Sequence, residues 1–127
     1  MRTLDNFTQA YIECALWSTN DESTPQGGEP LDKNYGPNDL APECLETMKA
    51  DCAKFQEENT DDIATYEDRT YTAEEMGGHD FWLTRNGHGA GFWDGDWPEP
   101  SGERLTEASR PFGEVNLYVG DDGLIYC

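Results

Sequence analysis

Residues 79–94 read HDFWLTRNGHGAGFWD, and this stretch decides the fold that the sequence predicts. Two segments rich in aromatic and apolar residues flank Asn86-Gly87, a dipeptide that favours a type I′ turn. The pattern therefore predicts a β-hairpin with a two-residue turn. In this register Trp82 faces Gly91, which leaves room for the indole. The opposite face, expected to be buried, carries Phe81, Leu83, Ala90 and Phe92.

A second hairpin is predicted at the end of the chain. Residues 114–120 (EVNLYVG) and 124–127 (LIYC) have the pattern of strands and flank the turn sequence Asp121-Asp122-Gly123. Between the two hairpins, residues 103–109 have the pattern of a short helix that ends before Pro111.

Two longer helices are predicted in the first half of the chain. One covers about residues 7–18, where Asn6 and Gln9 have the spacing of a capping box. Its apolar face is widened by Ile12, Leu16 and Trp17, so we expect burial on more than one side. The other begins near Asp39 or Ala41, tolerates Pro42 in its first turn and continues past Phe55. Its apolar stripe consists of Leu45, Met48, Cys52 and Phe55.

These elements predict an α+β fold in a single domain, residues 1–127. Residues 1–76 are expected to be mainly helical and loop, with a long loop at about 19–39, and residues 77–127 to be mainly β. In this architecture the N-terminal helices pack on a four-stranded antiparallel sheet built from the two hairpins.

The block HDFWLTRNGHGAGFWDGDW, followed by FGEVNLYVGDDGLIY, resembles a family of small uncharacterised proteins encoded by tailed bacteriophages and prophages. The segments FTQAYIECALW and LDKNYGPNDLAPE share the resemblance, which thus covers most of the chain. It implies a phage gene product that acts inside a bacterial cell. It assigns no activity, cofactor or catalytic residue.

The net charge restricts the partners that the chain can bind. The 127 residues include 27 Asp and Glu against 8 Lys and Arg, a formal charge of −19. Such a charge repels phosphate backbones and anionic lipid, which argues against direct binding to nucleic acid or membranes. The low mean hydropathy of −0.84 is typical of disordered chains. The aromatic content of 12% nevertheless supplies enough large apolar side chains for a core.

The cysteines and the start of the chain favour a cytoplasmic protein of the host cell. The sequence has neither an apolar run long enough for a membrane span nor an apolar leader segment. No Cys-x-x-Cys pair is present, so zinc-ribbon and thioredoxin-type motifs are excluded. Cys44 and Cys52 on one helix would lie about 12 Å apart, too far for a disulfide. We expect free, buried thiols at Cys14, Cys44, Cys52 and Cys127.

Motifs for catalysis and metal binding are weak. The sequence has no Gly-x-Ser-x-Gly elbow and no phosphate-binding loop, and a Cys–His dyad would need a buried cysteine to meet His79 or His88. In the predicted hairpin the two histidines lie about 20 Å apart and cannot share an ion. A site made of His79, Asp94 and Asp96 is conceivable, although Asp-Gly-Asp is equally a turn. We therefore predict no enzyme, no cofactor and no metal.

The acidic residues carry the strongest functional signal. Six acidic doublets hold twelve of the 27 acids, and residues 57–68 contain six acids without a base. If the second helix continued there, Glu57 with Asp61 and Glu58 with Asp62 would be unfavourable like-charge pairs. Solubility requires a net charge of only about 2 to 8 in a small domain. Salt adaptation is another explanation, and mimicry of DNA charge is the functional one.

The leading hypothesis is a phage-encoded, non-enzymatic inhibitor that resembles a DNA mimic. Its partner would be a basic host protein that handles nucleic acid, such as a restriction or CRISPR effector, a nuclease, a gyrase or a polymerase subunit. Residues 43–58 alone carry a net −3 over about 22 Å, against about 13 phosphates in duplex DNA. Several segments must therefore combine. The expected contact residues are Glu43, Glu46, Asp51, Glu57, Glu58, Asp61, Asp62, Glu67, Asp68, Glu74 and Glu75.

The alternative hypothesis is a small accessory binding protein that uses the aromatic hairpin. Tryptophan is enriched at protein interfaces, and the anchors would be Trp82, Trp93 and Trp97. In this case the acidity serves solubility or salt adaptation.

Overall fold

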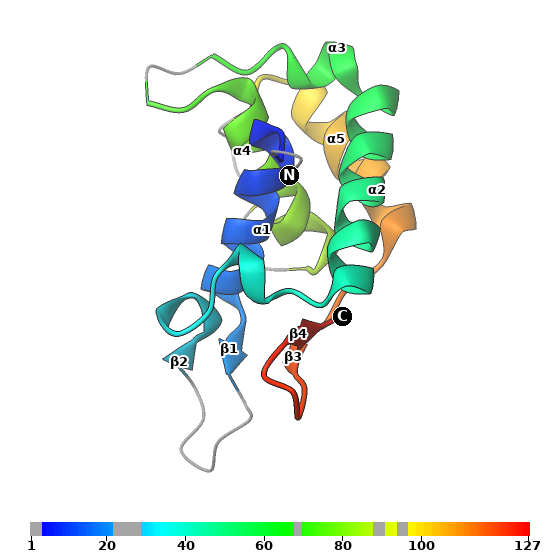
Figure 1. Ribbon diagram of the computed structural model, residues 1–127. Helices are drawn as coiled ribbons and strands as arrows, with labels where there is room; N and C mark the ends of the chain where they lie inside the picture. Colours follow the sequence, from blue (N-terminus) through cyan, green and yellow to red (C-terminus); the bar gives the residue numbers. More distant parts are fainter. Residues whose placement is uncertain (1–3, 22–28, 68–69, 88–90, 94–96) are drawn as a thin grey trace.

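The computed structural model describes residues 4–21, 29–67, 70–87, 91–93 and 97–127, and within them the fold is mainly helical (Figure 1). The α-helices are α1 (Asn6–Ser18), α2 (Pro42–Glu58), α3 (Thr60–Ile63), α4 (Ala73–Arg85) and α5 (Ser101–Ser109). Three short 3-10 turns are η1 (Leu31–Lys33), η2 (Pro37–Asp39) and η3 (Arg110–Phe112). The strands are β1 (Asn20–Asp21), β2 (Glu29–Pro30), β3 (Tyr118–Val119) and β4 (Ile125–Tyr126).

The predicted first hairpin is wrong, because its first strand is the second half of α4. The helix begins at a capping box: Thr72 Oγ1 accepts from the Glu75 backbone nitrogen at 3.1 Å, and Glu75 Oε1 accepts from that of Thr72 at 3.0 Å. Asn86-Gly87, predicted as a hairpin turn, ends the helix, with Gly87 at a φ of +68°. Residues 88–90 and 94–96 of the predicted hairpin lie outside the described residues.

A continuous buried face explains why the helix forms. Gly77, Gly78, Phe81, Trp82 and Arg85 are all buried and recur at spacings of three and four residues, the period of a helical face. The segment from His79 onward, which was predicted to be a strand, contains only part of this buried face. The predicted strand began at His79 and left out Gly77 and Gly78, which belong to the same buried face.

The glycine pair allows α1 and α4 to pack closely. A Cβ atom at Gly78 would overlap the carbonyl oxygen of Phe7 and lie 2.9 Å from the backbone nitrogen of Tyr11. Helix α1 itself begins at Asn6, one residue earlier than predicted. Asp5 rather than Asn6 caps it, because Asp5 Oδ1 accepts from the Thr8 backbone nitrogen at 2.8 Å.

The strands of the described residues form two separate antiparallel pairs, so the predicted four-stranded sheet is wrong. The C-terminal hairpin is present as β3 and β4, with Tyr118 opposite Tyr126 and Val119 opposite Ile125. The short helix predicted at 103–109 is α5. Residues 1–76 were predicted to be mainly helical and loop, and residues 77–127 mainly β. Helix α4 contains residues from both parts.

The core consists largely of aromatic rings from different helices. Phe55 of α2 stacks on Phe81 of α4, with ring centroids 4.1 Å apart, and Phe7 of α1 lies against both. Phe92 and Phe112 complete the cluster around Phe55. The apolar stripe predicted for α2 is confirmed at three of its positions, which are fully buried: Met48, Cys52 and Phe55.

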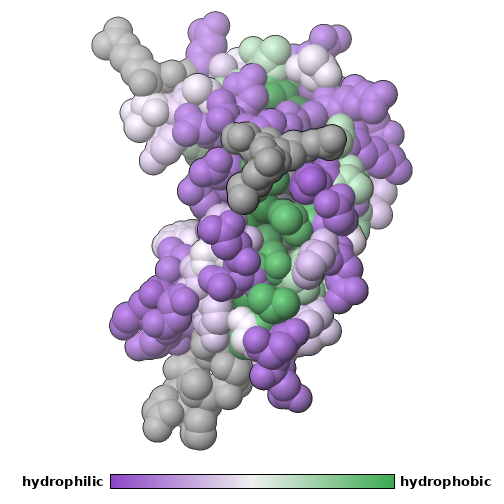
Figure 2. All heavy atoms as spheres, viewed as in Figure 1, coloured by the Kyte–Doolittle hydropathy of each residue, from purple (hydrophilic) through white to green (hydrophobic). Residues whose placement is uncertain are grey.

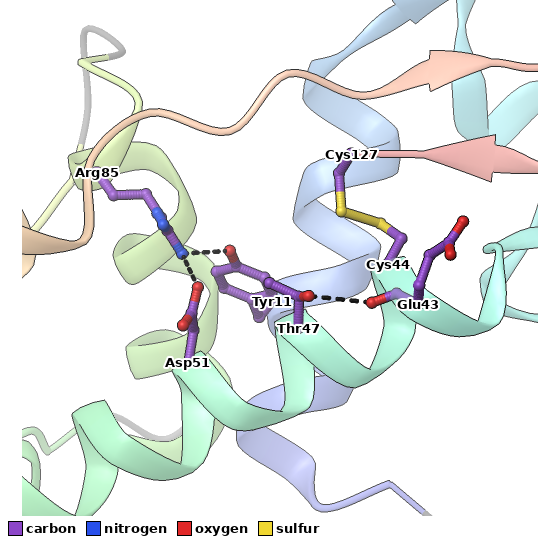
Figure 3. The surroundings of a disulfide bond; sticks show 7 residues. All are labelled: Tyr11, Glu43, Cys44, Thr47, Asp51, Arg85 and Cys127. Atoms are coloured by element: carbon purple, nitrogen blue, oxygen red, sulfur yellow. Dashed lines mark hydrogen bonds and ion pairs between the residues drawn. A yellow bond between two sulfur atoms is a disulfide. The ribbon is translucent and has the colours of Figure 1, made fainter.

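Two of the four cysteines form a disulfide, which corrects the prediction of four free thiols. Cys44, in the first turn of α2, is bonded to Cys127 at the end of the chain, with their Cα atoms 5.5 Å apart (Figure 3). Cys14 and Cys52 are free and buried. Burial raises the pKa of the Cys14 thiol to about 12 and raises that of Cys52 as well.

None of the helices in the described ranges combines the length and the apolar composition that crossing a bilayer requires.

Replacing Gly78 by Ala should destabilise the protein by about 2 to 3 kcal/mol, because the methyl group must push α1 away from α4. Denaturant unfolding measures the loss. The control is Gly36→Ala, where the added Cβ meets no atom within 4 Å and stability should change by less than about 0.5 kcal/mol. Equal stability of the two variants would contradict the close helix contact.

Thiol titration should find no reactive thiol in the folded protein, because the two free cysteines are buried. Unfolding without reductant should expose two thiols, and unfolding with reductant four. Cys127→Ser should cost about 4 to 5 kcal/mol, since the bond closes a loop with a sequence separation of 83. Four thiols in the unreduced, unfolded protein would show that the disulfide is absent.

Candidate functional site

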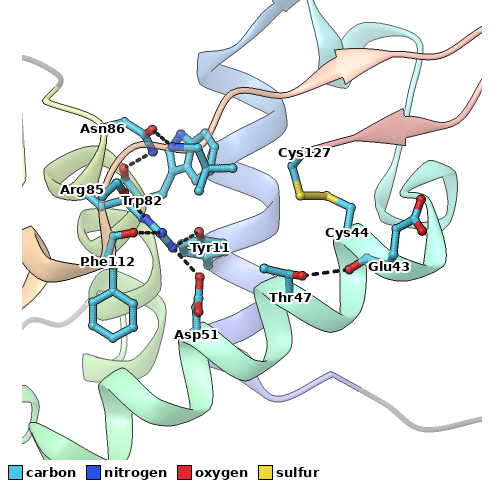
Figure 4. A network of polar contacts seen from close by, with 12 residues as sticks. Tyr11, Glu43, Cys44, Thr47, Asp51, Trp82, Arg85, Asn86, Phe112 and Cys127 are labelled. Carbon is cyan, nitrogen blue, oxygen red and sulfur yellow. Dashed lines mark hydrogen bonds and ion pairs between the residues drawn. A yellow bond between two sulfur atoms is a disulfide. The ribbon is translucent and has the colours of Figure 1, made fainter.

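The buried Arg85 of α4 forms hydrogen bonds with groups from several other elements (Figure 4). Arg85 Nη1 donates to Tyr11 Oη at 3.0 Å and to Asp51 Oδ2 at 2.9 Å. Nε donates to the Gly113 carbonyl oxygen at 2.8 Å, and Nη2 to that of Phe112 at 2.6 Å. Burial raises the pKa of the Tyr11 hydroxyl, so it remains protonated. Asp51, a predicted contact residue, is therefore part of the structural core.

Asp62, another predicted contact residue, also has a structural role. Arg104 of α5 donates to it from Nε and Nη2, with the shortest distance 2.6 Å, and Ser101 Oγ donates at 3.1 Å. The hydrogen bonds from Arg104 hold the pKa of Asp62 below its ordinary value. This pair ties α3 to α5.

The remaining acids of this region form a surface that we call the acidic end. Figure 1 shows the C-terminal end of α2, helix α3 and the start of α4 in the upper part of the molecule. The acidic end consists of exposed residues from these elements and from the segment between α3 and α4: Glu57, Glu58, Asp61, Glu67 and Glu74. Hydrophilic side chains dominate the face that Figure 2 shows, with hydrophobic atoms visible mainly in a band down its middle.

Other predicted contact residues lie elsewhere. Glu43 belongs to the first turn of α2, about 21 Å along the helix from Glu57. Glu46 pairs with Lys49 at 3.3 Å. Glu75 belongs to the capping box of α4, and Asp68 lies outside the described residues. The structure thus brings together only part of the predicted acidic surface.

The predicted surface of three tryptophans is not formed. Trp82 and Trp97 are buried, and their indole nitrogens donate to Ser18 Oγ and Asp80 Oδ2, both at 2.7 Å. Trp93 is 53% exposed. The most exposed tryptophan is Trp17, at 58%, which the apolar pattern of its helix had placed in the core.

Trp17 borders a cavity of about 540 Å³ between α1, the η1–η2 segment and the start of α4, which we call the aromatic cleft. Its rings come from all three elements: Trp17, Tyr35, Tyr71 and His79. Three carboxylate residues also line it: Glu13, Asp32 and Glu75. Methionine, proline and small residues complete the walls, so the cleft combines an apolar interior with negative charge.

Sequence reasoning missed this cleft because its walls are distant in the chain. Tyr35 belongs to the segment predicted as a long loop. Tyr71 precedes α4, a helix that was not predicted. The available signal was the capping box at Thr72, which would have placed Tyr71 at a helix start.

The conceivable metal site gains no support from the described residues. His79 Nδ1 lies 3.1 Å from Asp80 Oδ1, while Asp94 and Asp96 lie outside the described ranges. No group of three or more His, Cys, Asp or Glu side chains suited to a metal occurs in the part of the chain that the structure describes.

No protein-family model matches the chain, and comparisons with curated proteins and with solved structures find no match.

Asp51→Asn should lower the free energy of unfolding by about 2 kcal/mol, because the buried Arg85 loses its only carboxylate among the described residues. The same substitution at Asp61, which is exposed, should change it by less than about 0.5 kcal/mol. Denaturant unfolding of both variants separates structural acids from surface acids. Similar losses at the two positions would refute this division.

Proposed function

We propose that this chain is a non-enzymatic inhibitor that binds a basic, nucleic-acid-handling protein of a bacterial host through its acidic end. One observation carries the proposal. Among the described residues, Glu57, Glu58, Asp61, Glu67 and Glu74 are exposed and have no hydrogen-bond or ion-pair partner through their carboxylates. The fold therefore leaves these charges available to a partner.

Solubility and an aromatic binding surface agree less well with the charge and the structure of the chain. Solubility would be met by a net charge of about 2 to 8, well below the −19 of this chain. A concentration of unpaired carboxylates at one end can occupy the positions of phosphates on a basic surface and increases the rate of encounter. An accessory role for the three predicted tryptophans has less support, because Trp82 and Trp97 are buried.

The compartment in which the protein acts has two opposing indications. The resemblance to phage proteins favours the host cytoplasm, where disulfides are rare. The Cys44–Cys127 bond favours an oxidising compartment. We propose the cytoplasm, and lysis of the cells directly into denaturant with an alkylating reagent tests it. Four modified cysteines are expected from the cytoplasm, where the Cys44–Cys127 bond would be reduced, against two from an oxidising compartment.

A pull-down from bacterial lysate at low salt, eluted with a salt gradient, tests the proposed function. The wild-type protein should retain a nucleic-acid-handling protein that elutes at elevated salt, because screening weakens contacts between exposed charges. The triple variant Glu57→Gln, Glu58→Gln, Asp61→Asn should release the same protein at much lower salt.

The control variant removes three charges outside the acidic end: Glu43→Gln, Glu114→Gln and Asp121→Asn. Its elution should stay close to that of the wild type. Equal shifts for the two variants would mean that net charge alone drives retention. A partner whose elution is independent of salt would equally overturn the proposal.

A further inference from the structure

We infer that the aromatic cleft binds an arginine side chain carried by an extended segment of a basic polypeptide. The inference rests on the proposed function, because it names the chemical group of the partner that a second surface recognises. It uses residues separate from the acidic end, so the two surfaces can be tested independently.

The rings of the cleft are suited to a flat cation. Trp17 of α1 and His79 of α4 lie side by side, with centroids 6.4 Å apart and planes inclined by 33°. Tyr71 is 51% exposed and Trp17 more so, and Tyr35 is half-buried. Tryptophan and tyrosine faces attract cations placed within about 6 Å of their centroids, tryptophan most strongly.

The charge of the cleft selects a cation over an anion. Among the described residues, its lining contains Glu13, Asp32 and Glu75 but neither lysine nor arginine. Within the described part of the chain, the carboxylates of Glu13 and Asp32 have no hydrogen-bond or ion-pair partner. The neighbouring Lys33 pairs with Glu29 at 3.1 Å rather than with either of them. Unpaired carboxylates beside an apolar cavity complement a ligand that is both cationic and able to stack.

Arginine meets both requirements better than lysine. Its planar guanidinium stacks on aromatic rings and donates two parallel hydrogen bonds to a carboxylate, whereas the lysine ammonium is compact and strongly hydrated. The cavity of about 540 Å³ lies in the range of ligand sites. Because Trp17 and Tyr71 remain largely exposed, the cleft is open to solvent and a polypeptide can continue past it.

The exposure of Trp17 has no explanation in the stability of the fold. The indole lies on a helix whose other large apolar side chains are buried, yet more than half of its surface contacts solvent. Large exposed apolar patches that are rimmed by polar residues are typical of binding sites. A partner that covers Trp17 would bury this surface.

Fluorescence anisotropy with a labelled Gly-Ser peptide that carries two arginines tests the inference at low salt. The same peptide with lysine or with glutamine in place of arginine provides the specificity controls. We expect binding in the order arginine, lysine, glutamine, with no detectable binding of the last. Trp17→Ala should weaken the arginine peptide at least tenfold, and Glu13→Gln with Asp32→Asn should do the same.

Trp93→Ala is the matched control, because Trp93 is similarly exposed but does not line the cleft. It should leave the affinity unchanged, and thermal unfolding should show that every variant is folded. Equal binding of arginine and lysine peptides, or equal effects of Trp17→Ala and Trp93→Ala, would overturn the inference.

The acidic-end triple variant distinguishes this inference from the proposed function. It should change peptide affinity less than twofold while it releases the lysate partner at lower salt. Loss of peptide binding in that variant, with no effect of Trp17→Ala, would show that the peptide binds the acidic end and would refute a role for the cleft. Normal peptide binding without a salt-sensitive lysate partner would refute the proposed function and leave the cleft assignment standing.

Discussion

The burial of one guanidinium constrains the whole arrangement of helices. Arg85 must hydrogen-bond most of its donors, because an unpaired charge inside a protein is strongly destabilising. Its partners come from α1, from α2 and from Phe112 and Gly113 at the end of η3. The rings of Phe81 and Phe112 lie 5.4 and 5.5 Å from the guanidinium carbon and shield it from water. These hydrogen bonds connect α4 to α1, to α2 and to the chain that follows α5.

This constraint divides the acidic residues into two groups with different roles. Asp51 neutralises the central arginine, and Asp62 holds α3 against α5 through Arg104. Both carboxylates are half-buried and already paired with an arginine. Among the described residues, the carboxylates of the acidic end and those of Glu13 and Asp32 in the aromatic cleft have no such structural role. Some of the acidic residues therefore stabilise the fold. The unpaired carboxylates of the acidic end and of the aromatic cleft are the ones available to a partner.

Local signals were enough to predict several elements. Helix α2 was predictable because Met48, Cys52 and Phe55 repeat at helical spacing, and the C-terminal hairpin because Gly123 permits a turn with positive φ. Helix α4 was mispredicted, since Gly77-Gly78 has the composition of a break. Whether two glycines end a helix or lie at a helix crossing depends on the element that packs against them, and here that element is α1, more than sixty residues earlier in the chain.

The sequence by itself determined the acidic character of the surface, the residue ranges of α1 and α2, and the aromatic residues from which the core is built. Each of these depends on composition or on neighbours along the chain. Tertiary structure alone decided that Trp82 is buried and Trp17 exposed, that Cys44 meets Cys127, and which acids are paired. It also assembled the aromatic cleft from three distant segments. These properties arise from contacts between residues far apart in the chain, and periodicity within one segment carries no information about such contacts.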